Sequence, residues 1–350
     1  TDDLVTTLAI APRLANTLAR RPALLEMLVS NVGRSAAPKL PDDADFEMTL
    51  DLVRRWHGEQ AFLIGHQLLH GQLAARDAAK DWSDLADTCV QVMADTAAKE
   101  TERRFGPAPG VWSVVGLGKL GGREMTAESD LDIIVIYNDQ GASDAQTWFT
   151  KFTQRLIAAL SAETAEGRLY ETDMRLRPSG RSGPVASSVS SFETYHQSSA
   201  WTWEHMALTR LRPIAGDATL SQEIEAIAQT AIHTGDPDAR TVDVLDMRKR
   251  LVRDKPANGP WDLKMRQGGL IDLEFITQHA ILTAPVPQTL KPHLPQAQKQ
   301  LFETGIWSSE DYESLKSAFR FIQSLQQVQR MAHEDVVSQT ELSNALKNRL

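Results

Sequence analysis

The stretch that decides the fold is GLGKLGGREMTAESDLDIIVIY, residues 116–137. The mostly apolar run at 111–115 precedes its glycines and the apolar run at 133–137 ends it, so the sequence predicts a strand on either side of a glycine-rich turn. Side chains two positions apart on a strand point to the same face, so Asp130 and Asp132 project together while the residue between them turns away. The stretch therefore predicts a pair of carboxylates where a buried strand begins.

Two parallel carboxylates beside an apolar strand favour a divalent cation. Burying both acids without one is costly, because they lose solvation and repel each other. Mg²⁺ takes oxygen ligands, commonly one or two carboxylates together with substrate phosphates, and a pair of such ions can assist a phosphoryl displacement. A polar loop entering a strand explains residues 129–132 equally well, and spacing alone does not separate the two interpretations.

A second charged pattern lies at 168–177, where polar and apolar residues alternate as in a strand. The charged residues on one predicted face are Glu171, Asp173, Arg175 and Arg177. If this strand pairs beside the one that carries Asp132, then Asp173 supplies a third carboxylate and the two arginines lie near bound phosphates. A solvated sheet face with cross-strand ion pairs is the alternative interpretation.

The glycine spacing at 116–121 also matches the dinucleotide-binding fingerprint G-x-G-x-x-G, with Asp139 about 20 residues further on. That fold needs a full helix before the next strand, whereas residues 120–125 have room for fewer than about two turns. A Walker P-loop is excluded because Lys119 is followed by leucine. A short helix after the glycines can instead hold a polyphosphate while the acids hold metal ions.

The composition is that of an ordinary globular protein with an acidic balance. The 350 residues include 37 Lys and Arg against 46 Asp and Glu, a net charge of −9, which disfavours a nucleic-acid binder. No apolar run approaches the ~18 residues of a membrane span, so we expect no membrane partner. Cys89 is the only cysteine and no secretory signal opens the chain, which favours the cytoplasm. The chain lacks an initiator Met and reads as a piece of a longer protein.

The hydrophobic patterning and the Gly and Pro content along the chain predict three regions. Residues 1–105 form a helical lead-in, with a linker at 36–43, and residues 106–215 form a mixed unit that includes an amphipathic helix at 144–163. Residues 216–350 form a helical C-terminal region. From Ser188 onward we expect helices, except at 261–266, whose alternation predicts a short strand. The predicted fold class is α+β.

Short glycine turn, short helix and paired acids resemble the DNA polymerase β-like nucleotidyltransferase superfamily. The resemblance then becomes specific, in four strings that occur in order: residues 116–137, YETDMRLRPSGRSGPV at 170–185, AWTWEHMALTRLRPIAGD at 200–217 and WDLKMRQGGLIDLEFITQ at 261–278. Together they look like glutamate-ammonia-ligase (glutamine synthetase) adenylyltransferase, from near Leu14 to at least Ile281. The resemblance implies a small mixed nucleotidyltransferase sheet flanked by helical bundle segments.

That family joins two similar halves, one that removes AMP and one that adds it. Residues 173–180 and 201–205 resemble the carboxyl-terminal, AMP-adding half. One departure concerns Gly118-Lys119, where the superfamily usually has Gly-Ser. A phosphate contact by the serine hydroxyl would then have to come from Lys119 or from the backbone.

The resemblance implies an assignment of roles. Asp130 and Asp132 would bind two Mg²⁺ ions, and Asp173 would complete the site of the ion that activates the nucleophile. That nucleophile is a tyrosine hydroxyl of glutamine synthetase, which attacks the α-phosphorus of ATP and expels pyrophosphate, thereby regulating nitrogen assimilation. The residues expected around the nucleotide are Gly118, Lys119, Ser129, Arg175 and Arg177. The family responds to PII signal protein and to glutamine.

Three other functions stay open. The chain could carry out phosphate-driven removal of AMP, or be a catalytically silent regulatory module, or act on RNA or DNA like a polymerase, which the acidic balance disfavours. Trp201 and His205, one helical turn apart, could line an adenine pocket, although a buried aromatic stripe is the more common reason for such spacing. Lys264 and Arg266 are expected on one strand face, in a supporting role near Glu274.

Overall fold

The computed structural model describes residues 11–29 and 33–332 of the chain. Its centre is a small mixed sheet of order β3-β2-β1-β5, in which β4 also pairs with β2. The strands are β1 (Val111–Gly116), β2 (Leu131–Asn138), β3 (Thr172–Asp173), β4 (Ala186–Ser188) and β5 (Arg212–Gly216). β1 is antiparallel to β2 and β5, whereas β3 and β4 both run parallel to β2.

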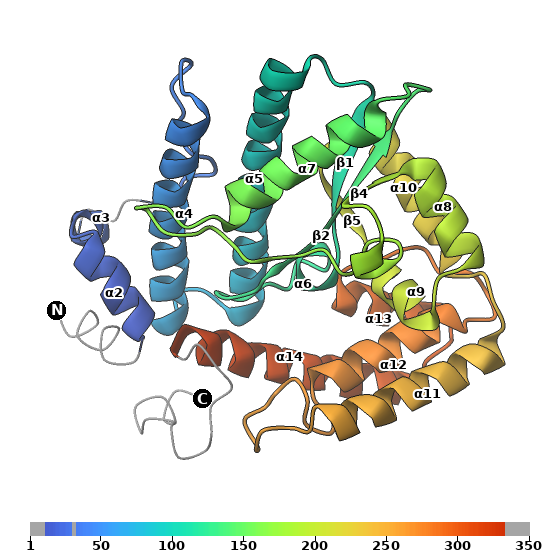
Figure 1. Ribbon diagram of the computed structural model, residues 1–350. Helices are drawn as coiled ribbons and strands as arrows, with labels where there is room; N and C mark the ends of the chain where they lie inside the picture. Colours follow the sequence, from blue (N-terminus) through green and yellow to red (C-terminus); the bar gives the residue numbers. More distant parts are fainter. Residues whose placement is uncertain (1–10, 30–32, 333–350) are drawn as a thin grey trace.

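Helices precede and follow the sheet (Figure 1). Before it come α2 (Pro12–Arg20), α3 (Ala23–Val29), α4 (Phe46–Leu69) and α5 (Ala75–Phe105). Between the strands lie α6 (Gly118–Gly121), α7 (Ala145–Ser161), α8 (Val189–Ser198) and α9 (Thr202–Leu208). After it follow α10 (Ala218–Ala231), α11 (Pro237–Asp254), α12 (Leu270–Leu282), α13 (Leu294–Glu303) and α14 (Ser309–Ala332).

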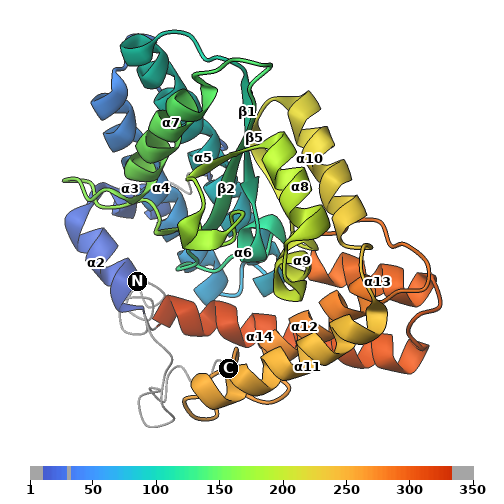
Figure 2. The ribbon, with the colours of Figure 1, turned by 45° about the vertical axis from the view of Figure 1, so that its right-hand side comes forward.

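The alternation of β2 divides the core into two layers. Ile133 and Val135 belong to the hydrophobic cluster that includes residues of α5 and α7, and Ile134 and Ile136 belong to the cluster that includes residues of α8 and α10. Figure 2 shows these helix pairs on opposite faces of the sheet. By the same two-residue period, Asp132 lies on the α8 and α10 face.

The C-terminal helices form a third layer at one end of the sheet. A separate cluster joins α12, α13 and α14 through leucines and Phe319, and α14 continues past α5 toward α2 (Figure 1). The Gln327 side chain on α14 donates to the backbone oxygen of Met125, at 2.7 Å. Near the end of the same helix, Met331 packs against Gly65 of α4. The segment after the glycine turn is therefore hydrogen-bonded to α14.

The α+β class and most predicted elements are confirmed. The lead-in is largely helical in its described part, although residues 1–10 and 30–32 of the predicted helical region lie outside the described residues. The expected strands correspond to β1 and β2, and the helix expected over 144–163 is α7. α6 has only four residues, which agrees with the short helix that argued against a dinucleotide-binding fold.

The long strand predicted over 168–177 is wrong beyond two residues. β3 contains only Thr172 and Asp173, and the chain then turns. The turn forms because the Asp173 carboxylate accepts the backbone N–H of Arg175 at 2.8 Å, while the N–H of Arg177 donates to the Met174 oxygen at 3.3 Å. Arg175 and Arg177 therefore do not share a strand face with Asp173.

Residues 261–266 form turns instead of the predicted strand. The buried carboxylate of Asp262 accepts the backbone N–H groups of Asn258 (3.1 Å) and Met265 (2.9 Å), a local pattern that competes with strand pairing. Lys264 and Arg266 thus share no strand face.

The expectation that only helices follow Ser188, apart from that piece, missed β5. This strand contains Pro213, which an edge strand tolerates because one side of its backbone needs no partner strand.

In the described residues, no helix has both the length and the hydrophobicity needed to cross a bilayer.

Arg54 ties the lead-in helices to the sheet unit and generates a stability prediction. Its guanidinium, 2% exposed on α4, donates to the backbone oxygens of Ala159 (2.8 Å), Ala162 (2.9 Å) and Gly167 (2.9 Å). Arg54→Met should cost about 3 kcal/mol of unfolding free energy, since buried carbonyls lose their donors. Arg55→Met is the matched control, because its exposed ion pair with Glu166 is worth under about 1 kcal/mol. Equal urea midpoints for the two variants would contradict this account.

Candidate active site

Three carboxylates converge where β2 begins. Oxygen atoms of Asp130, Asp132 and Asp173 lie within 4.8 Å of one another. The parallel pairing of β2 with β3 sets Asp132 directly opposite Asp173 in register, and Asp130 lies two positions earlier on the chain. The structure therefore brings together the three acids that the sequence singled out.

The electrostatics of this cluster call for a cation. Burial, followed by the charges of Asp130 and Asp173, raises the pKa of Asp132 from its ordinary value of 3.8 to about 6. A set of carboxylate oxygens alone is the donor type that hard divalent cations such as Mg²⁺ take, whereas zinc sites favour nitrogen and sulfur. The residues present thus fit a magnesium site.

Arg175 forms an ion pair with the third carboxylate, that of Asp173. Its backbone N–H and its guanidinium both donate to Asp173, with Nε lying 2.7 Å from Oδ2. Burial alone would raise the pKa of Asp173, but the hydrogen bonds from Arg175 outweigh it and the net shift is downward. The side chain of Arg175 is 65% exposed, so this pair lies at the mouth of the site, where a ligand can reach the arginine.

An open cavity of about 390 Å³ accompanies the carboxylates. It is lined by Asp130, Glu171, Thr172, Asp173, Met174, Arg175, Arg177 and Arg181. Acids that can hold cations and arginines that can hold phosphates share this cavity, which suits a metal-bound polyphosphate.

The glycine turn passes directly over Asp132. Gly118 has a φ of +52°, and a Cβ at this position would lie 2.3 Å from the Asp132 Oδ2 atom. The neighbouring Leu117 N–H donates to the Asp132 backbone oxygen at 2.9 Å. Glycine is required here both for the left-handed backbone and for the close approach. The turn therefore brings bare backbone next to the carboxylate cluster.

Two arginines around β5, to which no role was assigned from the sequence, hold this turn. The buried Arg210 donates from Nε to the Gly118 oxygen (2.9 Å) and from Nη2 to Glu124 (2.8 Å). Arg212 donates to the Leu120 oxygen at 2.8 Å and pairs with Asp87 of α5. The sequence gives little indication of these contacts. Every residue has a backbone carbonyl, so residue types do not show which carbonyls an arginine binds.

Two of the predicted nucleotide residues are engaged in local turns. The buried Ser129 hydroxyl accepts the Thr126 N–H at 2.9 Å and so closes the turn that leads to Asp130. The Arg177 guanidinium donates to the Met174 oxygen at 2.8 Å, within its own loop. Either side chain would have to exchange these bonds to contact a nucleotide.

Lys119 is half-buried and faces a mixed set of charges. Burial, followed by the charges of Lys264 and Arg330, lowers its pKa to about 8, while Glu274 and Asp130 act in the opposite direction. The charge of Asp130 thus acts on Lys119, but less strongly than the cations Lys264 and Arg330.

Trp201 and His205 do not share a pocket. Trp201 precedes α9 and is 69% exposed; together with Trp203 it lines a separate cavity of about 150 Å³, which none of the three clustered acids lines. His205 is buried, and its Nε2 atom lies 2.9 Å from the His196 backbone oxygen. Neither the adenine pocket nor a common aromatic stripe forms from this pair.

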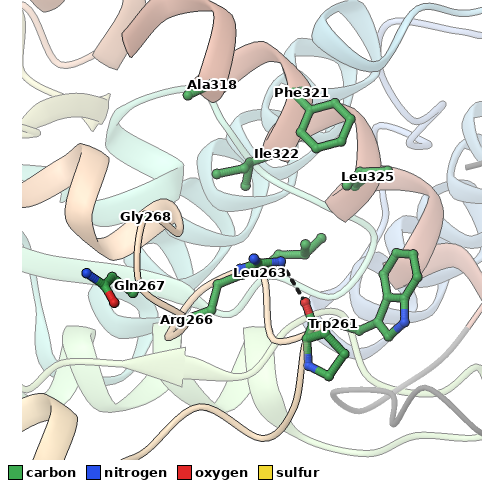
Figure 3. A pocket seen from close by; sticks show the side chains of 10 residues that line it. Trp261, Leu263, Arg266, Gln267, Gly268, Ala318, Phe321, Ile322 and Leu325 are labelled. Carbon is green, nitrogen blue, oxygen red and sulfur yellow. Dashed lines mark hydrogen bonds between the residues drawn. The ribbon is translucent and has the colours of Figure 1, made fainter. Parts of the chain in front are cut away.

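Another cavity, of about 410 Å³, lies between α14 and the turns around residue 263 (Figure 3). Leu263, Phe321 and Ile322 contribute to its mostly apolar wall. None of the clustered carboxylates lines it, so we place the candidate chemistry in the polar cavity beside β3 instead.

The sheet, the glycine turn and the acid cluster together define an α+β nucleotidyltransferase-like fold. Sequence comparison then gives the family: the chain belongs to the glutamate-ammonia ligase adenylyltransferase family, whose model matches residues 1–227. A second family model, described as GlnD PII-uridylyltransferase, matches residues 239–339.

Similar curated proteins carry the name bifunctional glutamine synthetase adenylyltransferase/adenylyl-removing enzyme. One from Agrobacterium fabrum is 39% identical over 94% of this chain and 36% of its own length. One from Mesorhizobium japonicum is 44% identical over 81% of this chain and 31% of its own length. The chain thus spans about a third of the length of the curated relatives that it matches.

The raised pKa of Asp132 predicts a pH-dependent stability. The Asp132 carboxyl binds its proton more tightly in the folded protein than in the unfolded chain. The unfolding free energy therefore falls as pH rises through about 6. In EDTA at pH 8, Asp132→Asn should therefore unfold with about 1 to 2 kcal/mol more free energy than the wild type, a difference that disappears near pH 4. Urea unfolding followed by tryptophan fluorescence measures both.

The matched control is Asp144→Asn, an exposed residue whose side chain makes no cap hydrogen bond to α7. It should change stability by less than about 0.5 kcal/mol at either pH. An Asp132→Asn protein that is less stable than the wild type at pH 8 without metal would show that the carboxylates are not held against their mutual repulsion.

Proposed function

We propose that this chain transfers AMP from ATP to a tyrosine hydroxyl of glutamine synthetase and releases pyrophosphate, so that it regulates nitrogen assimilation. The observation that carries the proposal is the convergence of Asp130, Asp132 and Asp173 beside the glycine turn. Membership of the adenylyltransferase family supports the reaction type, and the names of the relatives support the protein substrate. The catalytic unit is residues 106–215, with helical regions 1–105 and 216–350 around it.

The chain's residues divide the reaction between them. A tyrosine oxygen attacks the α-phosphorus, the bond from that phosphorus to the pyrophosphate oxygen breaks, and the phenolic proton leaves. A tyrosine has a reference pKa of about 10, so an acceptor for that proton is needed. We assign the acceptor role to a carboxylate oxygen of Asp173, which Arg175 now holds in place.

Asp130, Asp132 and Asp173 would hold Mg²⁺. When bound, this ion would polarise the phosphate and favour the ionised tyrosine. Gly118 brings backbone within reach of the nucleotide, and Lys119 and Arg175 supply positive charge to its phosphates. Ser129 and Arg177 contribute to the nucleotide site indirectly, because their hydrogen bonds close the turns beside it.

We also propose that PII signal protein regulates the reaction and that the reaction takes place in the cytoplasm. The similarity of residues 239–339 to the GlnD PII-uridylyltransferase model supports a regulatory part in the C-terminal helices. The single buried Cys89 is compatible with a reducing compartment.

The proposal is tested by incubating the chain with Mg²⁺, ATP labelled in its α-phosphate and unmodified glutamine synthetase. The label should appear on a tyrosine of the target, located by peptide mass spectrometry. Asp130→Asn and Asp132→Asn should each lower the rate by at least about 10³-fold, because each removes a carboxylate from the metal site. Asp144→Asn should retain the wild-type rate.

A second reaction mixture contains adenylylated glutamine synthetase and inorganic phosphate without ATP. Release of ADP there, with no labelling in the first mixture, would assign the chain to AMP removal. Retained transfer by either Asp→Asn variant would refute the metal assignment.

A further inference from the structure

The carboxylate oxygens of Asp173 are almost fully used by one neighbouring residue. Oδ1 accepts the Arg175 backbone N–H at 2.8 Å and the Arg175 Nε at 3.0 Å, while Oδ2 accepts Nε at 2.7 Å and also Nη2. An ionised carboxylate offers about four acceptor sites in total. The contacts from Arg175 therefore take up the positions through which Asp173 could bind a metal ion.

Arg175 is also a counter-ion for the whole acid cluster. The pKa of Arg175 is raised, first by its hydrogen bonds to Asp173, and the charges of Asp132 and Asp130 act in the same direction. A divalent cation at the same three carboxylates provides the same kind of compensation. Because two cations repel each other and both need the Asp173 oxygens, the guanidinium and a metal ion are alternatives at this place.

The ion pair is arranged so that the guanidinium can leave while the carboxylate stays in position. The Asp173 side chain is 14% exposed, whereas the Arg175 side chain is 65% exposed. An ion pair with one partner this exposed contributes little stability, so breaking it costs little. The bond from the Arg175 backbone N–H does not depend on the side chain and continues to hold Oδ1 when the side chain moves. Oδ2 is therefore the exchangeable oxygen.

A bound polyphosphate gives the guanidinium a second partner in the same cavity. Arg175 lines the cavity of about 390 Å³ together with Asp130 and Asp173. A guanidinium binds phosphate oxygens with the same two-pronged geometry that it uses for a carboxylate. A polyphosphate that carries a metal ion into this cavity thus replaces the carboxylate that Arg175 gives up.

We propose that Arg175 is an exchangeable counter-ion, which a metal ion displaces from Asp173 and a phosphate group then binds, so that divalent metal and polyphosphate bind this site cooperatively. This inference rests on the proposed nucleotide site. Because coupling between two ligands is reciprocal, each raises the affinity for the other through this one side chain. The site therefore takes the metal–polyphosphate complex in preference to the free metal ion.

Two binding measurements with opposite expected signs test the exchange without glutamine synthetase. Mn²⁺ is the probe, since it takes the same oxygen ligands as Mg²⁺ and its free ion is detected by electron paramagnetic resonance. In Arg175→Met, Mn²⁺ alone should bind about tenfold more tightly, because its competitor for Asp173 is gone. Inorganic tripolyphosphate titrated in saturating Mn²⁺ should bind about tenfold more weakly, because it loses one charge-assisted contact.

Two further variants separate this contact from a general effect of charge. Arg181→Met removes an exposed cation that lines the same cavity and acts on Asp173 through its charge. Its Mn²⁺ affinity should stay within about twofold of the wild type, since exposed charges are screened. Arg175→Lys keeps the positive charge and should bring both affinities most of the way back to the wild type. Urea midpoints measured in Mn²⁺ show that each variant is folded.

An Mn²⁺ affinity that stays the same or falls in Arg175→Met would overturn the exchange, and so would an equal gain in Arg181→Met. The outcome is separable from that of the proposed function. A chain that shows the two opposite shifts yet never labels glutamine synthetase keeps the exchange and loses the function. A chain that labels its target while Arg175→Met leaves both affinities unchanged keeps the function and loses the exchange.

Discussion

The site depends on a parallel pairing only two residues long. Leu131 lies opposite Thr172 and Asp132 opposite Asp173, and the Leu131 N–H donates to the Glu171 oxygen at 2.9 Å. Without this pairing the third carboxylate would belong to a loop. The pairing brings like charges together, which raises the pKa of Asp132, and Arg175 offsets part of the repulsion from the exposed side. The short strand thus places carboxylates that repel one another side by side, and a cation bound with a polyphosphate can offset this repulsion.

The second constraint is the position of the glycine turn over that cluster. Gly118 can approach Asp132 only because it lacks a side chain, and its carbonyl is held by the buried Arg210. A charge this deeply buried is tolerated because Glu124 and Glu274 face it. The backbone of the turn is therefore rigid before any ligand arrives, which spares the ordering cost of a flexible phosphate-binding loop.

How far the sequence predicted this arrangement depends on the range of the interactions. The two strands on either side of the glycine turn follow from local patterns and were predicted correctly. Asp130 lies just before β2, and its carboxylate is close to that of Asp132. The extent of β3 was not predicted correctly, because side-chain bonds to Asp173 turn the chain after two residues. Arg210 was missed as well. It binds the Gly118 backbone carbonyl about ninety positions away, and no residue pattern records such a partner.

The C-terminal helices bear on where the catalytic unit ends. The match to the adenylyltransferase family covers residues 1–227, and the match to the uridylyltransferase model begins at 239, so sequence similarity divides the chain after the sheet. The physical contacts cross that division: α13 binds Glu124 through the Leu294 N–H, and α14 binds the Met125 oxygen. A shift of α13 or α14 would break buried hydrogen bonds to the segment that carries Gly118. A movement of these helices is therefore transmitted to the glycine turn through Met125, and through Glu124 and Arg210.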